Sequence, residues 1–334
     1  MNYIGSKFKL SSWIQEEVKK IVGDDLSEKV FCDIFAGTGI VGRTFKKEVK
    51  QVISNDLEHY SYVLNKNYIE NHEEIKDKDK YIEELSNLPL IDSGFIYQNY
   101  CLGSGSERQY FSDENGKKID TIRTKIKEWK ENNKIDSNLY YFLLASLLES
   151  ADKIANTASV YGAFLKHIKK SASKDLVLKP ANFIENDKIH QVFNKDSNEL
   201  IKEISGDILY LDPPYNQRQY SANYHMLNTI TRYDDFIPKG KTGLREYNRS
   251  DYSKKNEVHN SFEGLIQNAK FKYIFLSYNN EGLMSEDDVK NIMQKHGKYS
   301  IVKKEYQRFK ADKTENRNHK ADKTFEYLHI LEKE

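Results

Sequence analysis

VFCDIFAGTGIVG, residues 30–42, is the stretch of sequence that decides the fold. Its first six residues form an apolar run with one aspartate, Asp33, and predict a buried strand. The residues from Gly37 onwards match Gly-x-Gly-x-x-Gly, in which glycines let the backbone turn tightly and approach a ligand. A helix is predicted from about residue 41 to residue 50. Strand, glycine turn and helix in this order are typical of a parallel sheet.

The segments that follow extend this pattern. Residues 51–55 predict a second short strand, and residues 60–71 predict a helix because apolar side chains recur there at helical spacing. Further strands are predicted at residues 208–211 and 272–278. Two late segments predict an antiparallel pair: residues 299–307 and 325–331. We therefore expect an α/β, Rossmann-like fold with a mixed, mostly parallel sheet.

The middle of the chain has a helical pattern instead. Residues 119–129 and 139–155 predict helices, the second with a broad apolar face. This pattern predicts a sheet domain formed by residues 1–87 and 203–334. The sheet domain is interrupted by a mainly helical insert over residues 88–202.

Bulk properties limit the class of protein. Charged residues make up 31% of the 334 residues, but the formal net charge is only +1, so a nucleic-acid-binding protein needs local basic patches. The two cysteines, Cys32 and Cys101, have no metal or disulfide spacing, and we expect no metal site. No apolar stretch approaches the roughly 18 residues of a membrane span. We expect a soluble, cytoplasmic protein.

The glycine turn and the residues around it fit more than one cofactor. Asp33 lies in the first predicted strand, and Asp56 follows the second, within reach of a pair of ribose hydroxyls. The pattern suits a nicotinamide site or an S-adenosylmethionine site. A glycine-rich turn with a capping aspartate remains the structural alternative.

A second motif follows the apolar run at 208–211. Asp212-Pro213-Pro214-Tyr215 combines a carboxylate, two rigid prolines and an aromatic ring where a strand is expected to end. Ligands bind at the carboxyl ends of strands in open α/β sheets. The combination suits holding a planar base by its amino group while stacking on its face.

Three segments in this order resemble the Dam-like, alpha-type family of S-adenosylmethionine-dependent DNA adenine methyltransferases, and type II modification methylases in particular. They are Asn2-Tyr3-Ile4-Gly5-Ser6-Lys7, Phe35-Ala36-Gly37-Thr38-Gly39 and the tetrapeptide at 212–215. The resemblance implies methyl transfer to the 6-amino group of an adenine flipped out of duplex DNA. It also implies that the insert is the target-recognition region. An RNA adenine methyltransferase, a nucleic-acid-binding protein with a vestigial methylase fold and a nicotinamide dehydrogenase remain alternatives.

The resemblance also assigns residues to roles. Asp212 and the Pro213 carbonyl would accept hydrogen bonds from the adenine amino group, and Tyr215 would stack on the base. The implied catalytic residues are Asp212, Pro213, Pro214 and Tyr215. The implied cofactor-binding residues are Tyr3, Lys7, Asp33, Phe35, Gly37, Thr38, Gly39, Asp56 and Asp212.

Two locally basic segments, residues 239–255 and 303–323, are candidates for phosphate contacts, although flexible solvated loops would have the same composition. Arg218, just past the tetrapeptide, is a candidate for a phosphate or for the orphaned partner base. The candidate DNA-binding residues are Arg218, Lys239, Lys241, Arg245, Arg249, Lys310, Lys313 and Arg317. The expected partners are double-stranded DNA and, functionally, a cognate restriction endonuclease.

Overall fold

The computed structural model describes residues 6–307 and 323–334. They form two compact units. The helical unit comprises residues 66–185 and 220–247, and the sheet unit comprises 6–65, 186–219 and the described residues from 248 onwards.

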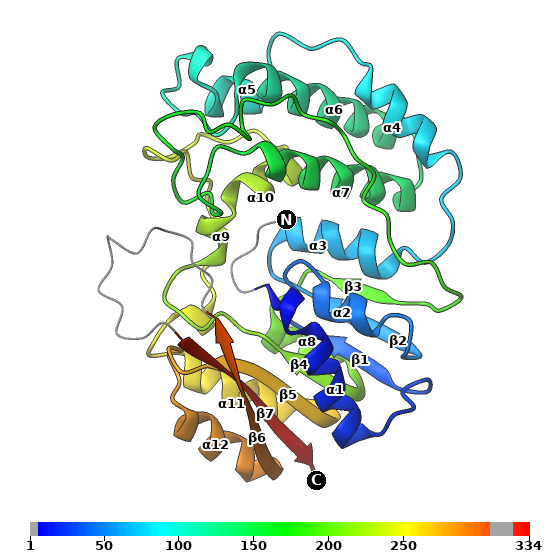
Figure 1. Cartoon of the computed structure of the whole chain (residues 1–334), viewed down its shortest axis with the longest axis vertical. Helices are drawn as coiled ribbons and strands as arrows, with labels where there is room; N and C mark the ends of the chain where they lie inside the picture. Colours follow the sequence, from blue (N-terminus) through cyan, green and yellow to red (C-terminus); the bar gives the residue numbers. More distant parts are fainter. Residues whose placement is uncertain (1–5, 308–322) are drawn as a thin grey trace. The chain divides into compact units, whose positions relative to one another are not determined.

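In the described part of the chain, the sheet unit contains one seven-stranded sheet in the order β3-β2-β1-β4-β5-β7-β6 (Figure 1). Strands β1 to β5 pair in parallel, whereas β7 is antiparallel to both β5 and β6. The strands are β1 (Val30–Asp33), β2 (Gln51–Asn55), β3 (Gln191–Phe193), β4 (Ser205–Leu211), β5 (Lys270–Asn279), β6 (Gly297–Gln307) and β7 (Lys323–Lys333). The expected mixed, mostly parallel α/β sheet and its late antiparallel pair are confirmed.

The strand order places a topological switch point beside β1. From β1 the chain first forms β2 on one side and returns much later to form β4 on the other side. Asp33, the last residue of β1, pairs with Tyr210 of β4, so the two strands end at the same edge. This edge is where ligands bind in open α/β sheets, because the loops diverge there and leave a crevice.

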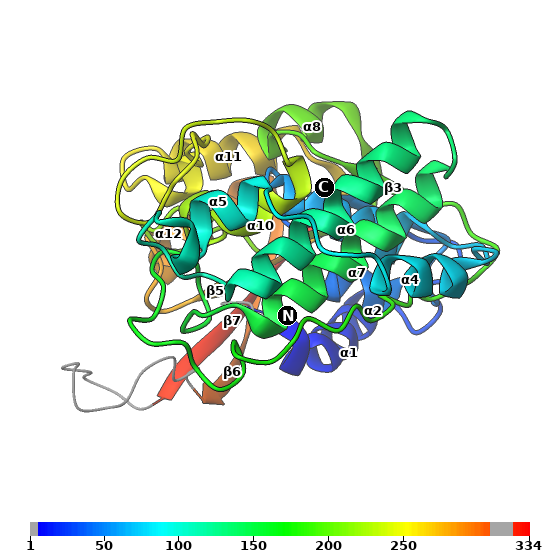
Figure 2. The ribbon, with the colours of Figure 1, turned by 90° about the horizontal axis from the view of Figure 1, so that it is seen from above.

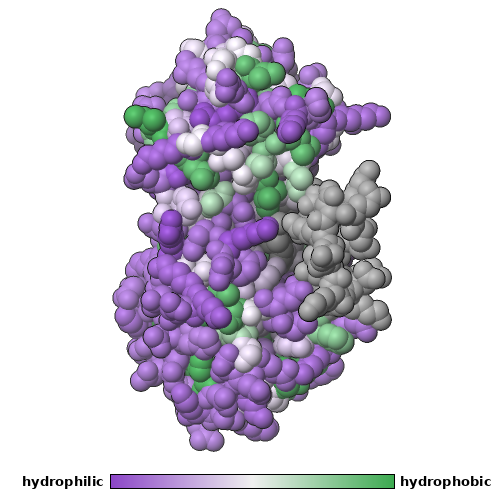
Figure 3. Space-filling view, turned by 90° about the vertical axis from the view of Figure 1, so that its left-hand side faces the viewer, coloured by the Kyte–Doolittle hydropathy of each residue, from purple (hydrophilic) through white to green (hydrophobic). Residues whose placement is uncertain are grey.

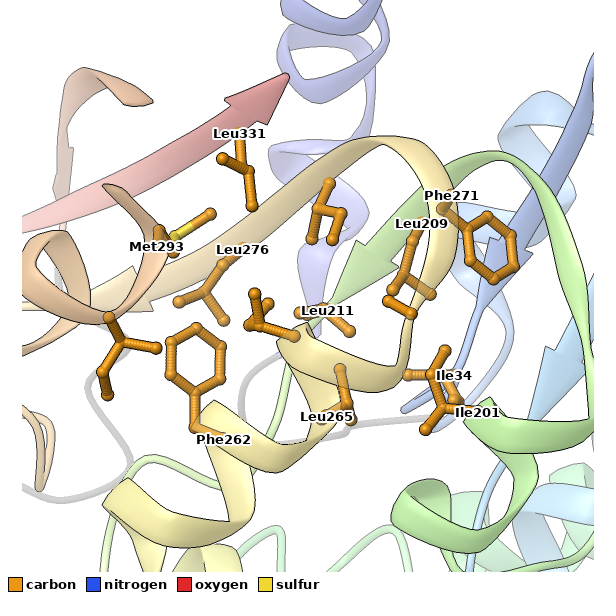
Figure 4. Close-up of a cluster of buried hydrophobic side chains, with 14 of the residues drawn as sticks. Ile34, Ile201, Leu209, Leu211, Phe262, Leu265, Phe271, Leu276, Met293 and Leu331 are labelled. Carbon is orange, nitrogen blue, oxygen red and sulfur yellow. The ribbon is translucent and has the colours of Figure 1, made fainter. Parts of the chain in front are cut away.

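Alternating side chains pack the two faces of the sheet against different helices. On one face, Cys32, Leu209 and Leu276 belong to a buried cluster with residues of α8 (Ser197–Glu203), α11 (Val258–Asn268) and α12 (Glu286–Met293), part of which Figure 4 shows. Phe31, the neighbour of Cys32, points to the other face and stacks on Phe45 of α2 (Ile40–Phe45). Helix α1 (Ser11–Val22) contacts α2. Both faces are covered, as a largely parallel sheet requires.

The helical unit is built around α6 (Asp113–Glu131) and α7 (Ser137–Ile154), which lie side by side in Figures 1 and 2. Ser112 and Asp136 cap their first turns by accepting backbone hydrogen bonds. The buried Arg123 of α6 donates to the carbonyls of Ile230 and Thr231 at the end of α10. The other helices of the unit are α4 (Lys78–Ser86), α5 (Phe95–Tyr100), α9 (Tyr220–Asn223) and α10 (His225–Arg232).

The boundaries of the helical unit differ from the expected insert, residues 88–202. The unit begins at residue 66, where α3 (His59–Asn65) gives way to a π-helical turn, Lys66–Glu70. Residues 191–203 lie in the sheet unit instead, because β3 pairs with β2. Residues 220–247 join the helical unit, where α6 caps α10. The role of the insert in target recognition stays a prediction.

None of the helices in residues 6–307 and 323–334 is long and apolar enough to cross a bilayer. The face in Figure 3 is mainly hydrophilic, with hydrophobic residues in small groups.

Candidate active site

Four carboxylates lie at the carboxyl-terminal edge of the parallel strands. Asp33 ends β1, Asp56 follows β2 and Asp212 follows β4. The fourth, Glu326, comes from β7, where it pairs with Asn279, the last residue of β5. Because β7 runs antiparallel, its first residues lie at the edge where the parallel strands end.

Lys7 connects two of these carboxylates. Its ammonium nitrogen Nζ lies 2.9 Å from Asp212 Oδ1 and 3.1 Å from Glu326 Oε1. Lys7 is only 5% exposed. Burial by itself lowers the pKa of Lys7, but the charges of Asp212 and Glu326 outweigh it and hold the pKa well above its ordinary value. Lys7 is therefore a buried lysine whose charged form is favoured by its two carboxylate partners.

The remaining acids carry more negative charge than Lys7 can balance. Burial raises the pKa of Asp212 to about 6, with Lys7 opposing the shift and Glu326 adding to it. Burial also raises the pKa of Asp56 to about 6. Burial and the charges of Asp212 and Asp56 raise the pKa of Asp33 well above its ordinary value. Raised pKa values in a cluster of acids mark a candidate functional site, and a positive charge placed there would favour the ionised carboxylates.

Asp33 is buried, and only part of its hydrogen-bonding capacity is used by the described residues. It is 1% exposed and accepts hydrogen bonds from the backbone N–H groups of Phe35 and Gly42. Its other acceptor capacity is unused, since Oδ1 has no hydrogen-bond partner among the described residues. A buried oxygen without a partner is costly, so a ligand with a donor group or a positive charge fits here.

The glycine turn brings the backbone close to this edge. Gly37 has φ 53° and Gly39 has φ 74°, a left-handed conformation that suits glycine. Gly37 N donates to Asp56 Oδ2 at 2.7 Å, and Gly37 O accepts from Asn65 Nδ2 at 3.1 Å and from Ser61 Oγ. The partly exposed Thr38 lies between the two glycines. Asp56 therefore fixes the turn, in addition to any contact that it makes with a ligand.

Aromatic residues border the two motifs. Phe35 meets Tyr252 edge to face, with ring centroids 4.9 Å apart. Tyr215 packs on the buried cluster of the sheet unit, and its carbonyl accepts from Leu283 N at 3.0 Å. Pro213 is buried and Pro214 is partly buried. The tetrapeptide is therefore held by packing and by a backbone hydrogen bond.

Most of the predicted catalytic and cofactor-binding residues come together in the sheet unit. They are Lys7, Asp33, Phe35, Gly37, Thr38, Gly39, Asp56, Asp212, Pro213, Pro214 and Tyr215. Tyr3, Lys310, Lys313 and Arg317 lie outside the described residues. Glu326 and its partner Ser277, which donates to Glu326 Oε1 at 3.0 Å, were not foreseen. Residues 275–279 and 326–330 resemble later strands of the family, but nothing in the sequence assigned Ser277 or Glu326 to the site.

The candidate DNA-binding residues separate into two groups. Arg218 and Arg249 are exposed in the sheet unit, and Lys239 and Lys241 are exposed in the helical unit. Arg245 does not fit the expectation. It is 8% exposed, and its guanidinium forms two hydrogen bonds with Asp234, at 3.0 and 2.8 Å. We therefore remove it from the set, because its charge is used inside the protein.

No group of three or more His, Cys, Asp or Glu residues in the described part of the chain has the geometry to hold a metal ion.

Sequence comparison gives matches along the whole chain. The model of the family described as D12 class N6 adenine-specific DNA methyltransferase matches residues 3–301. The type II methyltransferase M.NlaIII of Neisseria lactamica is 66% identical over 333 residues, which cover 100% of this chain and 99% of that protein. The type II methyltransferase M.FokI of Planomicrobium okeanokoites is 41% identical and matches 93% of this chain but only 50% of its own length.

Among solved structures, the magnesium protoporphyrin IX methyltransferase of Synechocystis PCC 6803 with bound SAH is similar at 9% identity. The match covers 96% of this chain and 82% of that one, with a TM-score of 0.35. A likeness this weak supports no conclusion about function.

We predict that Gly39→Ala destabilises the protein by about 1–3 kcal/mol, because the left-handed backbone strains a side chain. In addition, an added Cβ would lie 2.4 Å from Asn65 Oδ1, which accepts from Ser54 Oγ. Chemical denaturation measures the loss. The control is Gly105→Ala, because Gly105 has the same left-handed backbone, with φ 81° and ψ 4°, but has no atom within 4 Å of an added Cβ. An equal loss in both variants would contradict a steric role for Asn65.

Proposed function

The chain belongs to the D12 class N6 adenine-specific DNA methyltransferases, and from that premise we propose that it transfers a methyl group from S-adenosylmethionine to the 6-amino group of an adenine flipped out of duplex DNA. The position of Asp212 is the observation that supports this most strongly. It directly follows β4, which is the neighbour of β1 in the sheet, and it pairs with Lys7 at 2.9 Å. A carboxylate at the switch point is well placed to hold a base beside a cofactor.

We propose that Asp212 and Pro213 prepare the adenine amino group. The lone pair of that nitrogen is delocalised into the ring, which makes it a poor nucleophile. With Oδ1 held by Lys7, Asp212 Oδ2 and the Pro213 carbonyl would accept the two amino hydrogens and localise the lone pair. The attack of the amino nitrogen on the methyl carbon then depends on positioning and electrostatics, and no covalent enzyme intermediate is needed.

The carboxylate cluster and the glycine turn form the proposed cofactor site. When bound, S-adenosylmethionine supplies an electrophilic methyl group on a cationic sulfur. Its positive charges suit the edge where Asp33, Asp56 and Asp212 have raised pKa values. The proposed contacts to the cofactor are Tyr3, Lys7, Asp33, Phe35, Gly37, Thr38, Gly39, Asp56 and Asp212.

Base flipping is part of the proposal, since the amino group of a paired adenine is out of reach inside the duplex. Extrusion costs a few kcal/mol, which contacts to the flipped base must offset. We propose that the Tyr215 ring provides one of these contacts by stacking on adenine.

Lys239 and Lys241 are proposed phosphate contacts because they are exposed on the loop at residues 239–244, whose backbone is held by hydrogen bonds from Arg108 and Tyr100. Arg108 donates to the carbonyls of Gly240 at 3.0 Å and Lys241 at 3.3 Å. The Tyr100 hydroxyl donates to Gly243 O at 2.7 Å. Lys239 itself pairs with the exposed Glu246, a surface interaction worth at most about 1 kcal/mol that a phosphate can replace. The other proposed phosphate contacts are Arg218, Arg249, Lys310, Lys313 and Arg317.

We further propose that the enzyme is the modification component of a restriction–modification system. The support is the type II methyltransferase M.NlaIII, which is similar to the chain along almost its entire length. A cognate restriction endonuclease would then be a functional partner that cleaves the unmethylated form of the same site.

Expression of the protein in cells that lack adenine methylation tests the function. Sequencing that detects methylated adenine is expected to find it at one short sequence, while Asp212→Ala leaves that sequence unmethylated. The purified variant should keep much of its affinity for S-adenosylmethionine, because the glycine turn, Asp33 and Asp56 are unchanged. Unmethylated DNA with the wild-type protein, or normal methylation with the variant, would contradict the proposal.

Charge reversal tests whether Lys239 and Lys241 contact DNA phosphates. The double variant Lys239→Glu/Lys241→Glu should bind DNA more weakly. The plot of log affinity against log salt should become shallower by roughly 0.9 for each phosphate that the loop no longer neutralises. Lys270→Glu/Lys272→Glu changes the net charge equally and serves as control, because both lysines are exposed near the start of β5, away from its carboxyl end. The idea fails if both pairs change the slope alike, or if neither does.

A further inference from the structure

Glu326 has contacts that the reaction described so far does not use. It is 7% exposed in β7, and its Oε1 atom lies 3.1 Å from Lys7 Nζ. The same atom accepts a hydrogen bond from Ser277 Oγ at 3.0 Å. A carboxylate this deeply buried is stable only if it is paired and hydrogen-bonded, and Glu326 is both.

The antiparallel course of β7 puts Glu326 in this position. Ser277 of β5 pairs with Leu328 of β7, and Glu326 precedes Leu328 by two residues, so Ser277 and Glu326 are diagonal neighbours on one face. A parallel strand here would present its last residues to the edge instead. The chain therefore uses the reversed strand to bring a late acidic residue beside Lys7.

Lys7 is consequently shared between two carboxylates. Its ammonium is 2.9 Å from Asp212 and 3.1 Å from Glu326, nearly equal distances. Two negative charges on one positive charge leave the group with a net negative charge. If Glu326 were absent, Lys7 would pair with Asp212 alone. The Asp212 carboxylate would then be a weaker hydrogen-bond acceptor for any other donor.

We propose that Glu326 is a positioning residue for methyl transfer: by sharing the Lys7 ammonium, it fixes Lys7 against Asp212 Oδ1 and keeps Asp212 a strong hydrogen-bond acceptor for the adenine amino group. This inference rests on the proposed function. Lys7, Asp212 and Glu326 then act together, and Ser277 orients Glu326 by donating a hydrogen bond to it.

The pH dependence of the reaction reports on this arrangement. The charged and titratable groups that interact with Asp212 are Lys7, Glu326, Asp33, Tyr210 and Tyr215. Asp212 must be ionised to accept from the amino group, so the rate falls on the acid side. Glu326 raises the pKa of Asp212. Loss of the Glu326 charge therefore moves the acid limb of the profile to lower pH.

The test variant is Glu326→Gln, which keeps the shape and can still accept from Ser277. At saturating S-adenosylmethionine, kcat at the pH optimum is expected to fall roughly tenfold, the effect of about 1.4 kcal/mol in transition-state stabilisation. KM for DNA should stay unchanged, and the acid limb of kcat/KM should move to lower pH. An unchanged kcat, or a lower kcat with the acid limb in its wild-type position, overturns the proposal.

Glu332→Gln is the matched control, because Glu332 lies in the same strand but pairs with Lys298 on the surface. It should behave as wild type. If Glu326→Gln does not fold, as thermal unfolding will show, Ser277→Ala decides instead. That variant keeps the Glu326 charge and removes a donor that screens it, so the acid limb should move to higher pH. A shift to lower pH, or no shift, overturns the proposal. Each variant is compared with the wild-type enzyme under the same conditions. Absence of DNA methylation by the wild-type enzyme would contradict the proposed function, whereas a difference between variant and wild type reports on Glu326.

Discussion

The Lys7 ammonium, held between Asp212 and Glu326, is the interaction on which the site depends. A buried cation must be paired, and Lys7 has a carboxylate partner on each of two strand ends. The three residues come from the beginning, the late middle and the end of the chain. The ion pairs therefore form only when the short helix Lys7–Lys9, β4 and β7 are all in place.

The sheet topology explains why so much negative charge collects beside this cation. Parallel strands end at a common edge. An aspartate is the last residue of β1, and an aspartate directly follows each of β2 and β4. Burial raises the pKa values of these acids, and at Asp33 the charges of Asp212 and Asp56 add to the shift. One oxygen of Asp33 has no hydrogen-bond partner among the described residues. A bound cation would favour the ionised form of these carboxylates. In the proposed site, the sulfonium cofactor would supply that positive charge and would present its methyl group at the same edge.

Local signals were sufficient for some of this structure. The strand at residues 51–55, the glycine turn and the tetrapeptide at 212–215 are contiguous motifs, and each could be recognised without knowledge of its neighbours. Glu326 and Ser277 could not, because only the pairing of β5 with β7 brings them to Lys7. Arg245 looked like a free cation for the same reason: its partner Asp234 is 11 residues away in the sequence. The boundaries of the helical unit depend likewise on the pairing of β3 with β2 and on the capping of α10 by Arg123.

The central claim is that the acidic edge is completed by a cationic cofactor, and proton release on binding tests it most directly. Burial raises the pKa values of Asp56 and Asp212 to about 6, so both carboxyls are expected to be partly protonated near pH 6. A bound cation favours the ionised carboxylates and lowers their pKa values, so binding should release protons, and affinity should weaken as the pH falls through 6. Calorimetry in two buffers of different ionisation enthalpy measures this release. The account predicts release with S-adenosylmethionine and less with S-adenosylhomocysteine, which lacks the sulfonium charge. Binding of S-adenosylmethionine without proton release would contradict it.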